Sequence, residues 1–227
     1  MNRKHLLAAA LTVLTVLLTG CEQKTEEEVW VPGNPDAVSV DTEGHVTEYL
    51  TETLDQPYYS FQELHAMLLE EVSDYNAASG NEKIQVIDAK EEGKKVSLVL
   101  QYDSWKDVAD FNQIRFYAGS MIGAQLEGYL FDGTYHPVKN GNLHSESVAG
   151  SSVLAHMDEM VVVTSLPMEI HVPGTVTFIS SGMDLLGRQT AAERQQEAEQ
   201  ETEQEPAGES GAEDSGELRY VIYNDRE

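Results

Sequence analysis

Residues 83–102 read KIQVIDAKEEGKKVSLVLQY and form the clearest structural pattern in the chain. In the second half of this stretch, Ser97, Val99 and Gln101 alternate with four apolar positions, which are Val96, Leu98, Leu100 and Tyr102. That period of two is typical of a half-buried strand. A second β-rich run, Lys83–Lys90, precedes it across the turn sequence Glu91-Glu92-Gly93. Two such runs around a short glycine-containing turn predict an antiparallel hairpin.

Helical patterns lie on both sides of the hairpin. Ser60 and Glu63 match a capping box, which predicts that a helix begins there and ends at Ser79-Gly80-Asn81. Its buried stripe recurs at spacings of three and four residues: Phe61, Leu64, Leu68, Val72 and Tyr75. After the hairpin, Ser104 and Asp107 form a second capping box and predict one long helix through about Gly123.

Further strands are predicted before and after these helices. His45–Leu54 is β-leaning, residues 132–156 are loop-rich, and three runs separated by prolines predict strands at Met160–Ser165, Met168–Val172 and Thr175–Ser180. An antiparallel meander is the simplest arrangement of those three. The whole pattern predicts an α+β fold: a mostly antiparallel sheet with two packed helices in one domain.

The domain organisation follows from shifts in composition. We expect a signal peptide over residues 1–20, an acidic tether over 21–42, a core domain over 43–187, an acidic low-complexity segment over 188–217 and a C-terminal strand over 218–227. The low-complexity segment has ten acidic residues between Glu193 and Glu217, and its apolar residues are alanines, so it has little surface to bury. Thr190 and Glu193 match the start of a solvent-exposed helix through about Gln204. The β-rich run Leu218–Asn224 predicts a strand that returns to the core.

Charge and composition exclude several classes of protein. The 227 residues include 14 Lys and Arg but 40 Asp and Glu, for a net charge of −26. A nucleic-acid partner is therefore not expected, because phosphate binding needs basic residues to displace counterions. The 41% hydrophobic content is enough for a core and does not suit a collagen, a coiled-coil rod or a polytopic membrane protein.

The first twenty residues predict export. Arg3 and Lys4 lie in a positive N-terminal region, and an apolar run follows at residues 6–19. As a helix, that run would span about 21 Å, short of the roughly 30 Å hydrocarbon core, which favours a signal peptide over a permanent membrane span. Leu18-Thr19-Gly20-Cys21 then resembles the lipobox of bacterial lipoproteins.

That resemblance implies a lipid anchor. In the lipoprotein family the cysteine thiol, here Cys21, receives a diacylglyceryl group through a thioether, and a peptidase then cuts before it. The implied partner is the membrane, and the implied location is the extracytoplasmic face of the cell membrane. Cys21 is the only cysteine in the chain, so no intramolecular disulfide is expected. The alternative is an ordinary secretory signal that ends near a cysteine.

A second, looser resemblance rests on fragments of the mature chain. Asp110-Phe-Asn-Gln113 with Phe116 and Gly119, and the closing Tyr220-Val-Ile-Tyr223, resemble uncharacterised small lipoproteins of Gram-positive anaerobes. This resemblance implies no activity.

Catalytic motifs are not found in the sequence. There is no Gly-x-Ser-x-Gly elbow and no His-Glu-x-x-His motif. The best candidates for metal ligands are His136, His144, His156 and Asp158, with Glu159 beside them, although their spacing matches no known ligand pattern. No cofactor is expected.

We therefore favour a membrane-anchored, non-enzymatic binding or interaction module with an envelope protein as a candidate partner. Two alternatives stay open. One is an extracytoplasmic hydrolase acting on envelope material through His and Asp or Glu residues of region 132–159. The other is a substrate-binding lipoprotein of a transporter, for which a core of this length is small.

Overall fold

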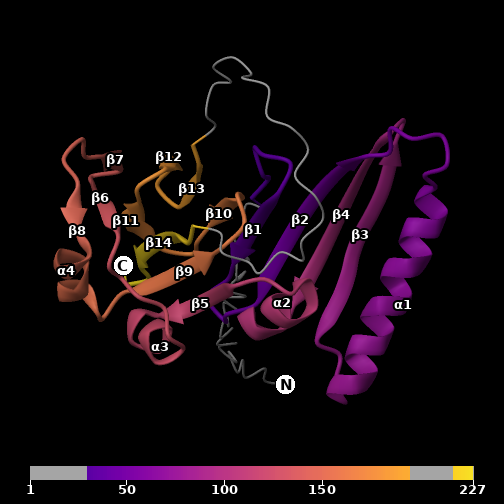
Figure 1. Cartoon of the computed structure of the whole chain (residues 1–227), viewed down its shortest axis with the longest axis horizontal. Helices are drawn as coiled ribbons and strands as arrows, with labels where there is room; N and C mark the ends of the chain where they lie inside the picture. Colours follow the sequence, from indigo (N-terminus) through magenta and orange to yellow (C-terminus); the bar gives the residue numbers. More distant parts are fainter. Residues whose placement is uncertain (1–29, 195–216, 227) are drawn as a thin grey trace, which may run out of the picture. The chain divides into compact units, whose positions relative to one another are not determined.

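The computed structural model describes residues 30–194 and 217–226, and it confirms the predicted α+β class (Figure 1). The described part holds four α-helices, one short 3-10 helix and fourteen strands in two mostly antiparallel sheets. The chain divides into two compact units, residues 1–31 and 32–227, and every described helix and strand belongs to the second. The predicted signal peptide, Cys21 and residues 195–216 of the acidic segment lie outside the described residues.

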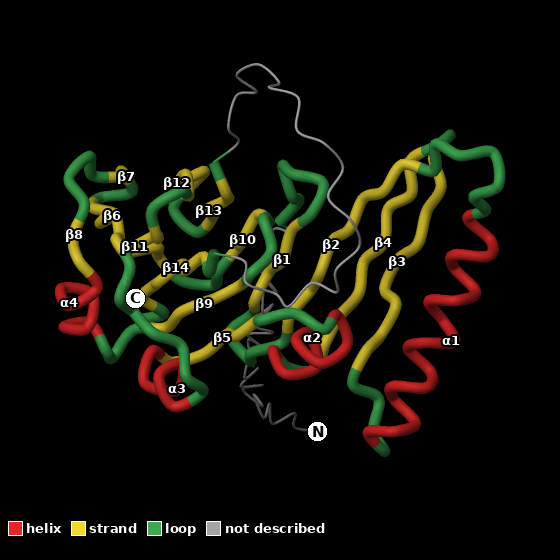
Figure 2. Tube along the Cα trace, in the orientation of Figure 1, coloured by secondary structure: helices red, strands yellow, loops and turns green. Residues whose placement is uncertain are grey.

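Sheet A has the strand order β12-β13-β10-β1-β2-β4-β3 (Figures 1 and 2). Its neighbouring strands are antiparallel except for β1 and β10, which are parallel. The strands are β1 (Ala37–Val40), β2 (Val46–Thr53), β3 (Ile84–Glu92), β4 (Lys95–Tyr102), β10 (Glu169–His171), β12 (Met183–Gly187) and β13 (Thr190–Glu193).

The predicted hairpin is present at one end of sheet A. β3 and β4 pair from Ile84 opposite Tyr102 to Glu92 opposite Lys95, with a shift of register between Val86 and Asp88 and with Gly93 at φ 67° in the turn. A glycine is favoured there because a side chain is strained in the left-handed region.

Helix α1 (Phe61–Ser79) lies beside β3 and begins where the capping box predicts (Figure 1). The Ser60 hydroxyl accepts a hydrogen bond from the backbone N of Glu63 at 3.3 Å, and Gly80 ends the helix at φ 69°. Asn76 ties the helix to the sheet, because its Oδ1 accepts from the backbone N of Ile84, the first residue of β3, at 2.9 Å.

Sheet B has the order β5-β9-β14-β11-β6-β7, with β8 pairing to β6 (Figure 2). The predicted C-terminal strand is present as β14, and it lies in the middle of this sheet between β9 and β11. The strands are β5 (Phe116–Ser120), β6 (Thr134–Lys139), β7 (Asn142–Leu143), β8 (Val148–Ala149), β9 (Met160–Thr164), β11 (Thr175–Ser180) and β14 (Arg219–Asn224).

Sheet B is buried on both faces. In β9, Val162 packs in the core shared with sheet A, whereas Val161 and Val163 pack in a second, aromatic cluster. In β14, Val221 and Ile222 divide between the two cores in the same way. Helices α2 (Trp105–Asn112), α3 (Met121–Leu126) and α4 (Gly150–Val153) and the 3-10 helix η1 (Leu154–His156) complete the described elements.

The single helix predicted from Ser104 to about Gly123 is wrong. Helix α2 ends at Asn112, Gln113 is left-handed at φ 55°, and β5 follows before α3 begins. The apolar residues looked helical because adjacent ones are buried on both faces: Phe116 packs in the shared core and Tyr117 in the aromatic cluster. The Ser104 hydroxyl also does not cap the backbone but contacts the Asp107 carboxylate at 2.5 Å.

The three proline-separated strands exist as β9, β10 and β11, but the predicted meander is wrong. β9 and β11 lie on either side of β14 in sheet B, and β10 lies in sheet A between β1 and β13. None of the three pairs with another of them, because each finds its partner in a distant part of the chain.

The loop-rich region and two predicted boundaries also differ from the structure. Residues 132–156 contain β6, β7, β8, α4 and η1, with Asn140-Gly141 as the turn between β6 and β7. Ala37–Val40, expected in the tether, forms β1. Thr190–Glu193, expected to start an exposed helix, forms β13, in which Ala191 and Ala192 are buried. Even alanines can therefore join the core where neighbouring strands cover them.

Candidate ligand-binding site

A cavity of about 590 Å³, here called the tyrosine cavity, opens on the aromatic side of sheet B. It is lined by Arg115 before β5, by residues between Gly128 and Tyr135, by Ser180-Ser181 at the end of β11, and by residues around the start of β14. These segments are far apart in the sequence, so only the tertiary structure brings them together. The volume is within the range of roughly 300–1,000 Å³ that is usual for small-molecule sites.

The wall of the tyrosine cavity is an aromatic cluster. The ring of Tyr220 lies 5.3 Å from that of Phe131 and 5.8 Å from that of Tyr135, measured between centroids. Tyr220 is fixed at both ends: its hydroxyl donates to the carbonyl of Leu130 at 2.7 Å, and its backbone N donates to the Ser180 hydroxyl at 3.0 Å. The wall is therefore preorganised before any ligand arrives.

The hydroxyl of Tyr135 is buried and has no hydrogen-bond partner among the described residues. Tyr135 is 1% exposed, and burial raises the pKa of its hydroxyl, with the nearby Tyr220 and Asp132 adding to the effect. Leaving a buried polar group unpaired costs about 1–3 kcal/mol. Tyr135 lines the tyrosine cavity, so a hydroxyl whose donor and acceptor are unused among the described residues belongs to one of the lining residues.

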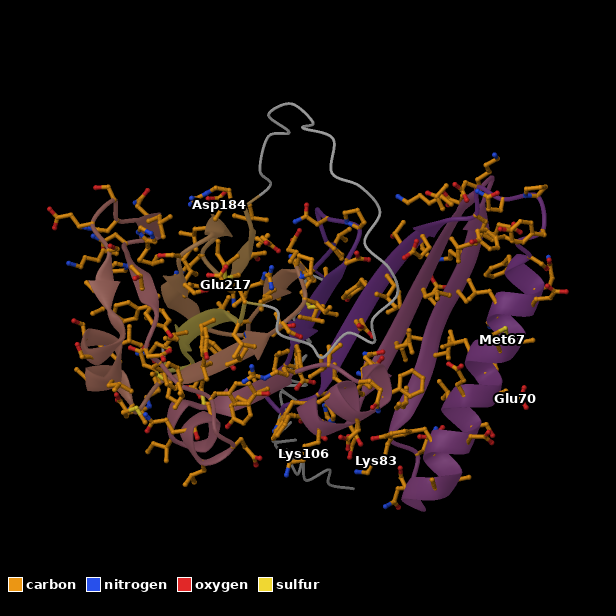
Figure 3. All side chains as sticks on the ribbon, viewed as in Figure 1. Met67, Glu70, Lys83, Lys106, Asp184 and Glu217 are labelled. Carbon is orange, nitrogen blue, oxygen red and sulfur yellow. The ribbon has the colours of Figure 1, made fainter. Side chains whose placement is uncertain are left out.

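Charges of both signs line the cavity. Arg115 places its guanidinium 5.5 Å from the centre of the Tyr129 ring and forms no ion pair with any described residue. Asp132 and Glu217 line the cavity as well. Glu217, labelled in Figure 3, lies two residues before the first residue of β14. Burial raises the pKa of Tyr220 to about 12; Arg115 lowers it and Asp132 raises it, so both charges act on the same hydroxyl.

The four predicted metal-ligand candidates are not brought together. Nδ1 of His136 lies 3.3 Å from the carbonyl oxygen of His144, which is exposed, and Asp158 pairs with Arg226 at 3.2 Å. His156 contacts neither of the other histidines but lies 3.1 Å from Glu159.

One group of three metal-ligand types does converge among residues 30–194 and 217–226, in the turn between β1 and β2. Ligand atoms of Asp41, Glu43 and His45 lie within 4.8 Å of one another. The side chains are largely exposed, and the 2.8 Å contact between Asp41 and His45 raises the pKa of the imidazole. This is the geometry of an ion-paired turn, and the sequence did not single it out.

The hydrolase alternative invoked His and Asp or Glu residues of region 132–159, and His156 with Glu159 is a histidine–carboxylate contact that the structure shows there. The Glu159 carboxylate is buried, contacts Nδ1 of His156 at 3.1 Å and accepts a hydrogen bond from the Thr177 hydroxyl. A histidine activates a hydroxyl nucleophile by contacting it directly. Here the hydroxyl of Thr177 contacts the carboxylate instead, so the arrangement is not that of a catalytic triad.

The residues of the tyrosine cavity carried no functional signal in the sequence. Asp132-Gly133 read as a turn and Tyr220 as part of a strand, and Arg115 fell inside the helix that does not form. Only the accumulation of tyrosines and phenylalanines in distant segments could have suggested a shared aromatic cluster.

No described helix is long and apolar enough to cross a membrane. Comparison with protein-family models, with curated proteins and with solved structures finds no match to this chain.

Proposed function

We propose that this protein is an extracytoplasmic lipoprotein, anchored in the membrane through a diacylglyceryl thioether on Cys21, whose folded unit is a non-enzymatic binding module. The observation that carries the proposal is the sequence Leu18-Thr19-Gly20-Cys21 directly after the apolar run, with Cys21 as the only cysteine. Only a thiol can accept the lipid, and it lies where the lipobox requires it.

The physical chemistry of such an anchor is consistent with the composition. Each buried CH₂ contributes about 0.8 kcal/mol, so that two acyl chains anchor stably where one is marginal. Removal of residues 1–20 takes away Arg3 and Lys4 and changes the net charge from −26 to −28. A body of that charge is repelled by an anionic leaflet, so the acyl chains have to supply the attachment.

Binding is favoured over catalysis by the contents of the tyrosine cavity. None of its described lining residues is a histidine or a cysteine, and the Ser180 hydroxyl already accepts a hydrogen bond from the backbone of Tyr220. A buried hydroxyl and charged side chains that have no hydrogen-bond or ion-pair partner among residues 30–194 and 217–226, together with a fixed aromatic wall, suit recognition of a ligand. In region 132–159 the hydrolase alternative has the His156–Glu159 pair, whose imidazole contacts the carboxylate but, among the described residues, no hydroxyl nucleophile.

The transporter alternative shares the anchor and the binding role. It differs in requiring a ligand held between two lobes that close on each other. The tyrosine cavity instead lies at the side of one sheet within a single compact unit, which favours a module whose partner is not a transporter.

The anchor can be tested by metabolic labelling with an alkyne analogue of palmitate, followed by detergent phase partitioning of the full chain. We expect the wild-type protein to be labelled and to enter the detergent phase, and Cys21→Ser to lose both properties. Thr19→Ala is the matched control, because a small residue is kept at the lipobox, and it should behave as wild type. Labelling that survives Cys21→Ser would contradict the proposal, as would a wild-type protein that remains in the aqueous phase.

A further inference from the structure

The charges of the tyrosine cavity form an unusual arrangement for so acidic a protein. Arg115 and Asp132 both act on the Tyr220 hydroxyl, yet they form no ion pair with each other. With 40 acidic residues in the chain, an arginine at a cavity mouth would be expected to find a carboxylate. Arg115 instead lies over the ring of Tyr129, so the opposite charges of Arg115 and Asp132 line one cavity without pairing with each other.

A ligand that carries both a negative and a positive charge would complement this lining. A guanidinium binds a carboxylate through paired hydrogen bonds, and a carboxylate binds an ammonium group. Glu217 adds a second negative charge to the lining, so the cavity is not suited to a simple anion. These properties favour a zwitterion over an acid or a neutral sugar.

The rest of the lining indicates the size and nature of the ligand between its two charges. Leu130 is 66% exposed and Leu218 is half-buried, so both offer apolar surface at the cavity. The unpaired Tyr135 hydroxyl favours a ligand that also carries a neutral polar group. A peptide group between apolar side chains provides both features, and about 590 Å³ leaves room for more than one residue.

We infer that the tyrosine cavity binds short peptides with free termini. Arg115 takes the terminal carboxylate, Asp132 the terminal ammonium group, Tyr135 a peptide polar atom, and Leu130 and Leu218 a side chain. This inference rests on the proposed binding role of the folded unit and names its ligand class, but it does not depend on the lipid anchor.

Thermal unfolding and calorimetric titration of the detergent-solubilised full chain test the inference. The probes are dileucine, trialanine and free leucine, together with the N-acetyl and C-terminal amide forms of the two peptides. We expect a free peptide to raise the unfolding midpoint by several degrees at 100 times its dissociation constant. Free leucine should bind more weakly, and capping either terminus should weaken binding at least tenfold.

Two variants assign the two ends of the peptide separately. Arg115→Gln should weaken binding of the free peptide at least tenfold. This variant should bind the free and the C-terminally amidated peptide with equal affinity. Asp132→Asn should also weaken binding of the free peptide at least tenfold. This variant should bind the free and the N-acetylated peptide with equal affinity. Tyr135→Phe, which removes only the unpaired hydroxyl, should weaken binding about threefold to tenfold without lowering the unfolding midpoint of the free protein.

Lys139→Gln and Asp55→Asn are the charge-matched controls, because both residues are exposed and lie outside the cavity lining. They should bind as wild type does. The inference is overturned if no probe raises the midpoint, if capped peptides bind as well as free ones, or if Arg115→Gln and Asp132→Asn leave binding unchanged. If the protein binds peptides but is not labelled by the palmitate analogue, only the lipid anchor is rejected. If it is labelled but binds no peptide, only the peptide ligand is rejected.

Discussion

The hairpin end of sheet A and the centre of sheet B are built in opposite ways. β3 and β4 are neighbours in the sequence, and α1 immediately precedes them. In sheet B, β14 pairs residues 219–223 with residues 160–164 of β9, and β5 joins from residues 116–120. The first region can therefore be specified by local pattern and turn chemistry, whereas the second depends on partners that no local pattern identifies.

The largest expected effect comes from removing the central strand of sheet B. Deletion of residues 219–227 removes four consecutive buried residues, Tyr220–Tyr223, and separates β9 from β11. Burial of each such side chain contributes about 1.5–3 kcal/mol, so their joint loss is comparable to the whole stability of a domain. We expect hydrogen exchange to show loss of protection throughout sheet B, with the amides of β3 and β4 affected least.

The matched control is deletion of residues 199–212 in the acidic segment. The two ends of that segment are held together by Arg219 and Glu193, whose side chains pair at 2.8 and 2.9 Å. Roughly halving the connection changes the loop-closure free energy by only about 0.6 kcal/mol. If both deletions shift the unfolding midpoint equally, or if β3 and β4 lose protection together with sheet B, the comparison between the two regions fails.

Substitution of glycines should give the next largest loss of stability, and the loss should again differ between the two regions. In the sheet B region, a Cβ on Gly150 would lie 1.5 Å from the carbonyl oxygen of Phe131, and one on Gly174 would lie 2.1 Å from that of Asn224. Backbone has to move in both places, so alanine at either position should cost about 3 kcal/mol or more.

The glycines at the hairpin end, Gly80 and Gly93, have nothing within 4 Å of an added Cβ. Their alanine variants should cost only the left-handed strain of about 1 kcal/mol. Chemical denaturation of the four variants measures the difference. Equal losses at all four positions would show that close approach of distant segments is not what distinguishes sheet B.

Glu48 is a buried charged residue beside the hairpin, in a region that is otherwise mainly apolar. Its substitution should change the stability of the protein less than the glycine substitutions, and the change should depend on pH. Glu48 is 2% exposed on β2, accepts from the Tyr102 hydroxyl at 2.6 Å and from Nδ2 of Asn112 at 3.2 Å. Burial raises the pKa of the Glu48 carboxyl above its ordinary value of 4.5; the two hydrogen bonds oppose this shift, and the charge of Asp36 adds to it.

The folded state therefore holds this proton more tightly than the unfolded state. The contribution of Glu48 to stability falls as the pH rises from 4.5 to the folded-state pKa, and is constant above it. We expect Glu48→Gln to remove this part of the pH dependence, as measured by the free energy of unfolding between pH 4 and pH 8. An unchanged slope in the variant would show that another group is responsible.

The smallest effect is expected at the cap of α1. Ser60→Ala removes the acceptor for the backbone N of Glu63 and should cost about 1 kcal/mol, measured as a lower unfolding midpoint. Ser104→Ala is the informative comparison, because Ser104 does not cap the backbone of α2. If Ser60→Ala and Ser104→Ala lowered the unfolding midpoint equally, the hydrogen bond from the Glu63 backbone N to Ser60 would not explain the loss. The capping box would then be a poor guide to stability at this end of the molecule.

The predictions that failed share one cause. Phe116 and Tyr117 were read as part of a helix because adjacent apolar residues do not distinguish a helix from a strand buried on both faces. The residues of β9, β10 and β11 were read as strands correctly, but their partners were not identified, because pairing depends on segments 40 or more residues away for β9 and β14. His136, His144, His156 and Asp158 were grouped because they are near one another in the sequence. In the structure His136 lies in β6 beside the carbonyl of His144, whereas His156 lies in η1 and contacts Glu159, and Asp158 pairs with Arg226.

The sequence by itself determined the elements whose partners are adjacent: the hairpin of β3 and β4, the start and end of α1, and the presence of a final strand. Hydrogen bonds and turn conformations over a few residues are sufficient for these. Only the tertiary structure decided which strands share a sheet, that β14 lies between β9 and β11, and that Arg115, Asp132, Tyr135 and Tyr220 surround one cavity. Those contacts form only when burial of distant apolar segments outweighs the entropy of bringing them together, and that balance is a property of the whole chain.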